Sequence, residues 1–282
     1  MEKPSRVATR PKSEVEVKMS NALIGFSGFV GGTLLKQADF SSLYRSSNIS
    51  DIRDKVFDII VCAGAPAQKW IANREPEADR QKIEELIENL RHTRCKKFVL
   101  ISTVDVFANP QKVDEDSEVI EEGLHAYGLH RRMLEKFIEE HFEDFLIVRL
   151  PGLVGPGLRK NVIFDFLNSN NVESIDSRSV FQFYPMVNLW SDIQIAMAGG
   201  LKKVHLTSEP ISVADVSFQG FGRTFENAQS RPAAVYDMHT KHAHLFKGEG
   251  RYQYNVRETV LAIRCYAQSE SLSPVESTGA VL

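Results

Sequence analysis

Cysteine is scarce in this sequence. Of 282 residues only Cys62, Cys95 and Cys265 are cysteines, and they lie far apart. No CxxC pair and no Cys and His set with zinc spacing occurs, which argues against a disulfide framework and against a metal centre. A chain of this kind fits a reducing compartment, so we expect a cytoplasmic protein.

Long apolar runs and an excess of either charge are also missing. No run reaches the roughly 18 apolar residues of a membrane span. The 34 basic and 37 acidic residues are intermixed and give a net charge of −3, which favours neither nucleic acid nor a membrane as partner. We therefore expect a small-molecule ligand.

Both ends of the chain are poor in apolar residues. Residues 1–18 are polar and mixed in charge, without the apolar stretch of a signal peptide, and are predicted to be a disordered leader. Residues 269–282 are rich in Ser, Glu and Pro and are predicted to be a disordered tail.

What the sequence does contain is a regular alternation of apolar patterns. Short apolar runs at 22–24, 56–61, 98–101 and 145–148 predict strands, and residues with helical spacing lie between them, as at Ile83, Leu86, Ile87 and Leu90. Parallel strands need such crossover helices. Residues 19–151 are therefore predicted to form a doubly wound α/β domain with a parallel sheet of the Rossmann type.

The alternation breaks up from residue 152 onward, where Gly, Pro, Asn and aromatic residues are interspersed. We expect residues 152–268 to form a smaller C-terminal substrate lobe over the carboxyl edge of the sheet. The run 204–206 is predicted to return to the sheet.

A Gly-rich turn follows the first predicted strand and opens a helix. It reads Gly25, Phe26, Ser27, Gly28, Phe29, Val30, Gly31. Small residues at this spacing let the chain turn sharply and admit a pyrophosphate against backbone N–H groups. An ordinary tight turn is the alternative, but the strand before and the helix after favour a dinucleotide site.

The sequence also carries a feature that bears on cofactor choice. About 20 residues after the first glycine, where a unit that binds NAD has an acid for the ribose hydroxyls, the chain has Arg45 and Ser46. A cation beside a hydroxyl suits a 2′-phosphate. We therefore expect NADP(H) to be favoured over NAD(H), with a plain surface arginine as the alternative.

Candidate catalytic groups follow the strand at 98–101. Ser102 and Thr103 end that strand, and Tyr127 and Arg131 lie one turn apart on a predicted helix. A hydroxyl residue together with a tyrosine beside a cation can transfer a proton to a carbonyl or from an alcohol, because the guanidinium stabilises a phenolate. Without the glycine turn, a solvated helix surface would be the simpler interpretation.

Over roughly residues 20–265 the sequence resembles the extended short-chain dehydrogenase/reductases, the NAD-dependent epimerase/dehydratase group. The resemblance rests on motifs that occur in the family's order: GFSGFVG, Asp51-Ile52, CAGA from Cys62, KKFVLISTVDVF from Lys96, YGLHR from Tyr127 and RLPGLVGPG from Arg149. It implies that Thr103 polarises the substrate oxygen and that Tyr127 passes the proton. It also implies that Asp51 and Ile52 line the adenine site, that Ala63 and Gly64 lie along the cofactor, and that a homodimer forms through the helix of Tyr127.

The sequence departs from that family at three positions. The lysine four residues after the tyrosine is Arg131, which keeps the charge and can bond ribose hydroxyls but never gives up its proton. An asparagine of the preceding helix aligns with Lys82, and the asparagine that often follows the Arg149 strand aligns with Gly152. The substrate class therefore does not carry over directly.

The predicted substrate lobe supplies polar and aromatic candidates for substrate binding: Arg159, Lys160, Asn161, Gln182, Tyr184 and Trp190. The cations suit a diphosphate and the aromatic rings suit a sugar or base. A basic loop and a small aromatic core are the alternative.

Two functions are consistent with these features. The first is an NAD(P)-dependent oxidoreductase or epimerase that acts on a sugar-derived, nucleotide-linked substrate, with a reductase favoured because reduction needs only the groups identified above. The second is a regulator or scaffold that binds the cofactor but has lost turnover, which Arg131 and Lys82 favour.

Overall fold

The computed structural model describes residues 20–270, so the predicted leader at 1–18 and the tail residues 271–282 lie outside the described residues. The strands are β1 Asn21–Ile24, β2 Ser42–Tyr44, β3 Val56–Cys62, β4 Arg94–Thr103, β5 Gln111–Val113, β6 Phe145–Leu150, β7 Gly152–Val154, β8 Val180–Phe181, β9 Phe183–Pro185, β10 Lys203–His205, β11 Ile211–Ser212 and β12 Asp237–Met238. The α-helices are α1 Phe29–Gln37, α2 Lys69–Arg74, α3 Pro76–Arg91, α4 Ala126–His141, α5 Val162–Asn168, α6 Leu189–Ala198, α7 Val213–Asp215 and α8 Val256–Ser269. Ser269, predicted to begin the tail, is thus the last residue of α8.

The central feature is a six-stranded sheet in the order β10-β6-β4-β3-β1-β2. Every neighbouring pair is parallel. The order reverses direction at β1 and β3, which defines a doubly wound Rossmann-like sheet and confirms the predicted fold class. The predicted return to the sheet is β10, which pairs with β6 through Val204 and Val148.

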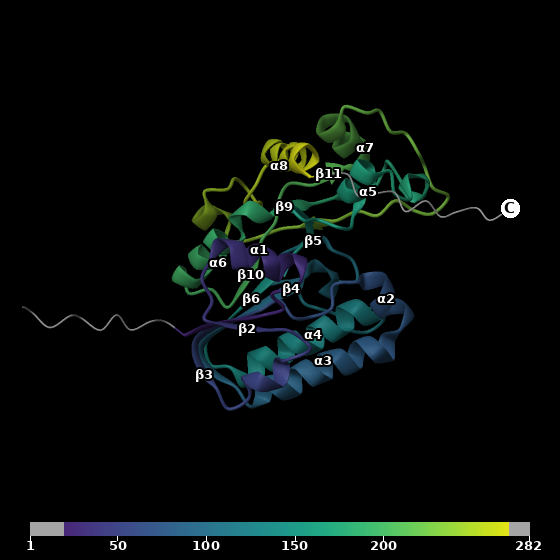
Figure 1. Cartoon of the computed structure of the whole chain (residues 1–282). Coiled ribbons are helices and arrows are strands. Elements are labelled where there is room, and N and C mark those ends of the chain that lie inside the picture. The colour runs from purple at the N-terminus through teal and green to yellow at the C-terminus, as the bar shows by residue number, and fades with distance from the viewer. Residues whose placement is uncertain (1–19, 271–282) are drawn as a thin grey trace, which may run out of the picture.

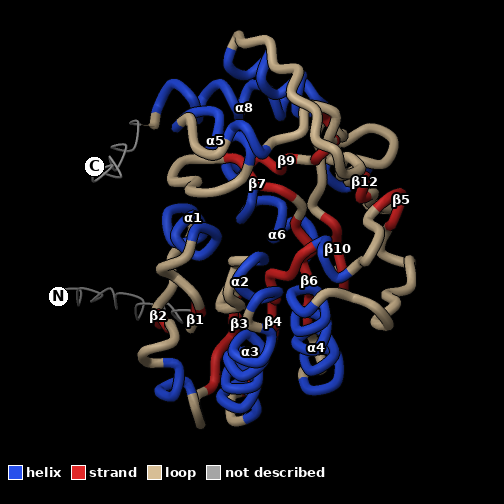
Figure 2. The backbone as a smooth tube through the Cα atoms, turned by 90° about the vertical axis from the view of Figure 1, so that its right-hand side faces the viewer, coloured by secondary structure: helices blue, strands red, loops and turns tan. Residues whose placement is uncertain are grey.

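Helices cover both faces of this sheet. Successive side chains of a strand point to opposite faces, so Ile60 and Phe98 pack under α3 and α4, while Val61 and Val99 pack under α1 and α6. Figure 2 shows α3 and α4 on one side of the strands and α1 and α6 on the other. Because both faces are buried, the strands carry continuous apolar runs instead of alternating ones.

Apart from α6 and β10, most segments after β6 lie at the upper end of Figure 1, among them α5, α7, α8, β9 and β11. Three two-stranded sheets occur among residues 20–270: β7 with β9, β8 with β11, and β5 with β12. Helices α5 and α8 and the turn that follows α7 share an apolar cluster that includes Ile163, Val216 and Ile263. The division of the chain into two parts at residue 151 stays a prediction.

The carboxyl ends of the parallel strands determine where a ligand can bind. The glycine turn follows β1, Arg45 follows β2, the segment 63–67 follows β3, and Thr103 ends β4. In a doubly wound sheet the ligand lies at this edge, next to the point where the strand order reverses.

Candidate active site

The glycine turn between β1 and α1 is held by close backbone packing. Gly25 has a φ of +85° and its N–H donates to the Tyr44 carbonyl at 2.8 Å. A side chain on Gly25 would overlap the Ala63 carbonyl, and one on Gly31 would overlap the Gly25 carbonyl. These two glycines are therefore needed for the approach of β1, α1 and the end of β3.

Gly28 has a different surrounding. A Cβ at this position would meet only the Gly25 carbonyl oxygen, at 3.5 Å, which is an ordinary contact. Gly28 and Ser27 are exposed, and Gly28 is the N-cap of α1 without a side-chain hydrogen bond to the first turn. Free N–H groups at a helix N-terminus attract phosphate. The small size of Gly28 thus leaves room for a ligand and is not required by packing.

Arg45 lies against this turn. Its side chain is exposed, and its guanidinium carbon is 5.9 Å from the centre of the Phe26 ring. The Arg45 Nε donates to the Ser47 hydroxyl at 3.0 Å, and Ser46 beside it is also exposed. Both predicted 2′-phosphate ligands are therefore accessible beside the turn.

The two residues predicted at the adenine site face different surroundings. Asp51 is exposed, but Ile52 is completely buried in the apolar core between the sheet and α3. Ile52 therefore offers no surface to a ligand in this conformation. Ala63 and Gly64, half-buried after β3, lie next to the glycine turn.

The end of β4 separates its two hydroxyl residues. The Ser102 hydroxyl donates to Glu135 at 2.6 Å in the interior, and the next side chain, Thr103, points the other way. Thr103 accepts from the Asp105 N–H at 3.1 Å, and its hydrogen bonding lowers the pKa of Tyr127. The structure thus brings together the predicted pair of Thr103 and Tyr127.

Gly128 permits this approach and was not predicted as a site residue. A Cβ at Gly128 would overlap the Asp105 carbonyl oxygen. Helix α4 therefore contacts the chain directly after β4, which places Tyr127 beside Thr103. The Gly that follows the tyrosine in the motif was the available signal.

Arg131 is held by the protein itself. Its guanidinium binds both oxygens of Asp79 and donates to the Pro66 carbonyl, and its carbon lies 4.0 Å from the centre of the Tyr127 ring. Only its Nε, among its described donors, is buried without a partner. Contact of Arg131 with a ribose stays a prediction, and it requires the guanidinium to share or change these partners.

Burial raises the pKa of Tyr127 above its ordinary value of 10.0. The charge of Arg131 offsets part of this rise, as does that of Lys69, while the charge of Asp105 adds to it. Arg131 lowers the pKa of Tyr127, as expected from the sequence, but the net shift of that pKa is upward. Tyr127 is therefore a protonated hydroxyl at neutral pH.

Lys69, Asp105 and Tyr236 contact one another beside Thr103 and Tyr127, and the sequence did not single them out as a group. The Asp105 carboxylate accepts from Lys69 at 2.8 Å and from the Tyr236 hydroxyl at 3.0 Å. Burial lowers the pKa of Lys69, but the charges and hydrogen bonds of Asp105 and Tyr236 together raise it more. The only sequence signal was a charged residue, Asp105, between the two buried valines after β4.

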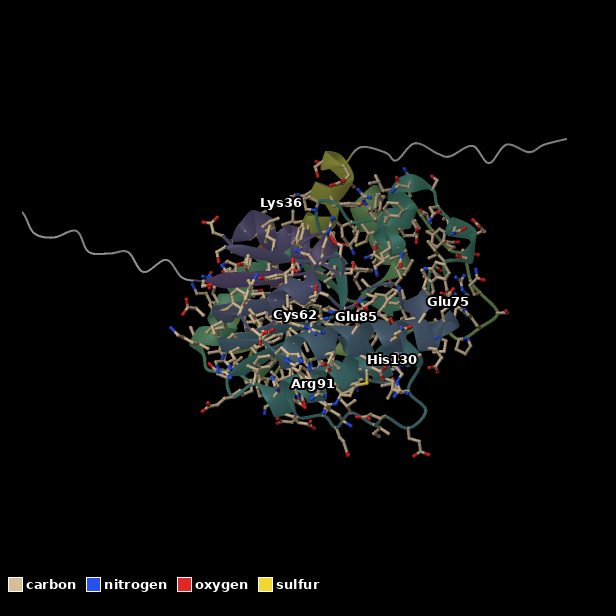
Figure 3. All side chains as sticks on the ribbon, turned by 60° about the horizontal axis from the view of Figure 1, so that its bottom comes forward. Lys36, Cys62, Glu75, Glu85, Arg91 and His130 are labelled. Carbon is tan, nitrogen blue, oxygen red and sulfur yellow. The ribbon has the colours of Figure 1, made fainter. Side chains whose placement is uncertain are left out.

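Asp79 was also missed, although its position carried a signal. On α3 it lies on the apolar face defined by Ile83, Leu86 and Leu90, and its side chain is 5% exposed. A carboxylate on a buried face needs partners, and here they are Arg131 and His130, whose Nδ1 is 2.7 Å from Asp79. Figure 3 views the molecule from the side of α3 and α4 and labels His130.

The three polar candidates at 159–161 differ in what they contact. Arg159 and Lys160 are both exposed, and the Lys160 ammonium donates to the Ala67 carbonyl, next to the carbonyl that Arg131 binds. Asn161 donates to the Leu153 carbonyl at 2.9 Å and caps α5 by accepting from Ile163 at 3.0 Å. Both ends of its amide are thus used within the protein.

Gln182 and Tyr184, predicted to bind substrate, lie in the core. Gln182 is 1% exposed, and its amide bonds Thr207, Ser208 and Met238. Tyr184 is fully buried and donates to Asp192 at 2.6 Å. With their polar groups satisfied and no accessible surface, neither is available to a substrate, and this corrects the prediction.

Trp190 packs edge to face on Phe40 beside α1, and its backbone N–H donates to the Gln37 side-chain oxygen at 3.0 Å. Binding of a substrate by its ring stays a prediction. Gly152 is explained by the same part of the fold, because a Cβ there would be 2.7 Å from the Gln182 carbonyl oxygen. The family's asparagine therefore has no room at this position.

Comparison with known proteins identifies the class to which this fold and site belong. Residues 22–181, more than half of the chain, match the model of the NAD dependent epimerase/dehydratase family. The chain belongs to this family, whose members are enzymes that use a nicotinamide cofactor. A search of curated protein sequences finds no match.

Solved structures show the same fold at low sequence identity. RMD from Pseudomonas aeruginosa, complexed with NADPH, has a TM-score of 0.65 at 16% identity over 89% of this chain and 99% of that one. WbmG from Bordetella bronchiseptica, in complex with NAD, has a TM-score of 0.70 at 14% identity over 90% of this chain and 96% of that one. MoeE5, in complex with UDP-glucuronic acid and NAD, has a TM-score of 0.67 at 13% identity over 88% of this chain and 99% of that one.

Within residues 20–270 no helix is long and apolar enough to cross a membrane. No group of three or more His, Cys, Asp or Glu side chains in the same range could hold a metal ion.

Proposed function

We propose that this protein reduces a carbonyl group of a nucleotide-linked sugar, with hydride from a nicotinamide cofactor. Thr103 and Tyr127 are the groups that act on the substrate oxygen. The observation that carries the proposal is that Tyr127 is held beside Thr103 with a raised pKa, because a reductase needs a proton donor at this position.

The bound nicotinamide would supply the hydride to the carbonyl carbon. As the C=O bond becomes a C–O single bond, the Tyr127 hydroxyl gives its proton to the oxygen. The Thr103 hydroxyl donates a hydrogen bond to the same oxygen and orients it. Arg131, with its guanidinium over the Tyr127 ring, then stabilises the phenolate that remains.

The test of this proposal is the variant Tyr127→Phe, assayed with a panel of nucleotide-linked ketosugars. It removes the transferable proton and keeps the ring against Arg131, so turnover should fall at least about 100-fold while cofactor affinity is retained. The wild-type rate should be constant through neutral pH and fall only in the alkaline range, since the acid must be protonated. Turnover that is indifferent to the substitution would show that the chemistry lies elsewhere.

We further propose that the preferred cofactor is NADP(H). Arg45 and Ser46 are exposed beside Phe26 of the glycine turn, where a 2′-phosphate would receive charge-assisted hydrogen bonds. Arg45→Asp should weaken NADPH about tenfold or more and leave NADH unchanged or tighter, as measured by titration calorimetry. Arg53→Gln, in the same segment but bonded to Asn89, is the control. Equal affinities for both cofactors before and after the change would contradict the assignment.

A second function, cofactor binding without turnover, is favoured by the contacts of Arg131. Its guanidinium is occupied by Asp79 and Pro66 instead of being free for a ribose. Tight NADPH binding without reduction of any carbonyl, in the wild type and in Arg131→Lys, would favour this function. The cytoplasmic location and a homodimer through α4 stay predictions.

A further inference from the structure

The backbone of Asp105 connects the two groups that act on the substrate oxygen in the proposed function. Its N–H donates to the Thr103 hydroxyl at 3.1 Å. Its carbonyl oxygen packs on Gly128, where a side chain would overlap it. Gly128 directly follows Tyr127 on α4, so Asp105 fixes the end of β4 and the start of that helix relative to each other.

The bond from Asp105 also determines how the Thr103 hydroxyl can be used. A hydroxyl has one hydrogen and two acceptor lone pairs. Because the Asp105 N–H occupies the acceptor side, the hydroxyl hydrogen is free to meet another oxygen. The hydrogen bond between Thr103 and Tyr127 lowers the pKa of Tyr127, which is the effect of a donor on a phenolate. Thr103 is therefore set as a donor, as the proposed reduction requires.

The Asp105 side chain is held by two residues from distant parts of the chain. Its carboxylate accepts from the Lys69 ammonium at 2.8 Å and from the Tyr236 hydroxyl at 3.0 Å. The Lys69 ammonium also donates to the Tyr236 oxygen at 3.2 Å, which closes a triangle of bonds. Lys69 begins α2, and Tyr236 precedes β12, which pairs with β5 (Figure 2). A movement of Asp105 would therefore break its contacts with both of these segments.

Tyr236 is itself fixed by its neighbours. Its backbone N–H donates to the Val180 carbonyl at 2.9 Å, and its ring centre lies 5.5 Å from that of Phe181. Burial and the charge of Asp105 raise the pKa of Tyr236, so its hydroxyl is protonated at neutral pH. The protonated hydroxyl is the form that donates to a carboxylate.

The charges of Asp105 and Lys69 act on Tyr127 in opposite directions. Burial raises and Arg131 lowers the pKa of Tyr127 most, and Asp105 then raises it whereas Lys69 lowers it. Because these two charges are bonded to each other, they stay at fixed positions beside the phenol. The other titratable groups around this part of the site are Asp79, His125, Lys160 and Tyr236, whose side chains bond Arg131, Gly128, Ala67 and Asp105 in that order.

We propose that Asp105 is a positioning residue of the reaction and that Lys69 and Tyr236 hold it in place. This proposal rests on the proposed function. In this role Asp105 does not touch the substrate. Its backbone orients Thr103 and spaces it from Tyr127, and its ion pair with Lys69 sets the charge next to the phenol.

The first experiment measures the pKa of Tyr127 and needs no substrate. All seven tyrosines are replaced by fluorotyrosine, whose more acidic phenol titrates at lower pH, and the fluorine NMR signal of Tyr127 is identified by its loss in Tyr127→Phe. Asp105→Asn removes a negative charge and should lower this pKa, whereas Lys69→Gln removes a positive charge and should raise it. Asp105→Glu restores the charge and should return the pKa toward that of wild type. Lys55→Gln is the control, because that lysine bonds the Tyr44 hydroxyl before the start of β3, and it should leave the pKa unchanged.

The signs of the two shifts distinguish positioning from a purely structural role. If the cluster only stabilised the fold, both substitutions would loosen the packing around Tyr127 and lower its raised pKa together. Shifts of the same sign, or no shift in either variant, would overturn the proposal. A protein without turnover would contradict the proposed function and leave this titration readable.

The second experiment uses Tyr236→Phe, which keeps the ring and removes the bond to Asp105, and it decides the question if a charge variant fails to fold. With a nucleotide-linked ketosugar that wild type reduces, kcat should fall about tenfold or more, since the orientation of Thr103 is loosened. KM and NADPH affinity should stay as in wild type. Tyr252→Phe is the matched control, because its hydroxyl donates to Asp237 at 2.6 Å, and it should retain kcat. Equal kcat values in Tyr236→Phe and Tyr252→Phe would contradict the proposal.

Discussion

Helix α4 carries two buried ion pairs one turn apart, and they differ in how completely they are enclosed. Glu135 and Arg149 are both 0% exposed, and the Glu135 carboxylate accepts from Ser102, Arg132 and two nitrogens of Arg149. Arg131 and Asp79 also bind each other, but the Arg131 Nε lacks a partner and its guanidinium covers the Tyr127 ring.

The difference indicates that the pair of Glu135 and Arg149 stabilises the fold, whereas the pair of Asp79 and Arg131 belongs to the candidate site. A buried charge is stable only when its partners are complete, as around Glu135. Burial raises the pKa of Glu135, but Arg149, Ser102 and Arg132 together lower it more, so the Glu135 carboxylate stays ionised. Next to Tyr127 the set of partners is incomplete, as the proposed function requires of a group that meets a ligand.

Breaking the enclosed pair should give the largest effect. Glu135→Gln leaves Arg149 buried without a counter-charge, so the free energy of unfolding should fall by about 3–5 kcal/mol, as measured by urea denaturation. Glu139→Gln, which removes a partly exposed partner of Arg132 on the same helix, should cost less than about 1 kcal/mol. Equal losses in the two variants would mean that enclosure does not determine the strength of the pair.

Breaking the second pair should cost less stability and change the site. Asp79→Asn should lower the free energy of unfolding by about 1–3 kcal/mol, since Arg131 keeps its bond to Pro66. Arg131 and His130 lower the pKa of Asp79 beyond the rise that burial causes, so its contribution is present above its ordinary pKa and is lost as the pH falls.

The pH dependence provides the sharper readout for that variant. Asp79→Asn should be less sensitive than wild type to a fall in pH below its ordinary pKa of 3.8, and Glu77→Gln, an exposed change on α3, should behave as wild type. The distinction between the two pairs would be wrong if Asp79→Asn lost as much free energy of unfolding as Glu135→Gln and kept the acid sensitivity of wild type.

Most of the fold could be predicted from local patterns. The apolar runs that became β1, β3, β4 and β6 are continuous because both faces of the sheet are buried, so their lengths and spacing indicate a parallel sheet with crossover helices. The pair of Thr103 and Tyr127 was found because strand end and helix start carry recognisable residues. Gly28 and Gly31 could not be told apart, since their difference depends on what lies opposite each Cβ.

The rest depends on contacts between distant residues. Gln182 and Tyr184 each carry a polar group, as a ligand-binding residue does. Only the folded structure shows that Gln182 donates to the Met238 carbonyl and Tyr184 to the Asp192 carboxylate. Asp79 and Arg131 are 52 residues apart in sequence, so periodicity indicated a buried carboxylate but not its partner. Tyr236 reaches Asp105 across 131 residues, without any local pattern.

The measurement that tests the central claim most directly is NADPH binding to wild type and to Gly28→Val. A valine at this position meets little protein but fills the space that a pyrophosphate needs, so the variant should keep its fold by circular dichroism and lose NADPH binding in titration calorimetry. Gly31→Val is the matched contrast and should disturb the fold, because its side chain would overlap the Gly25 carbonyl. A folded Gly28→Val protein that binds NADPH as wild type does would contradict a cofactor site at this turn.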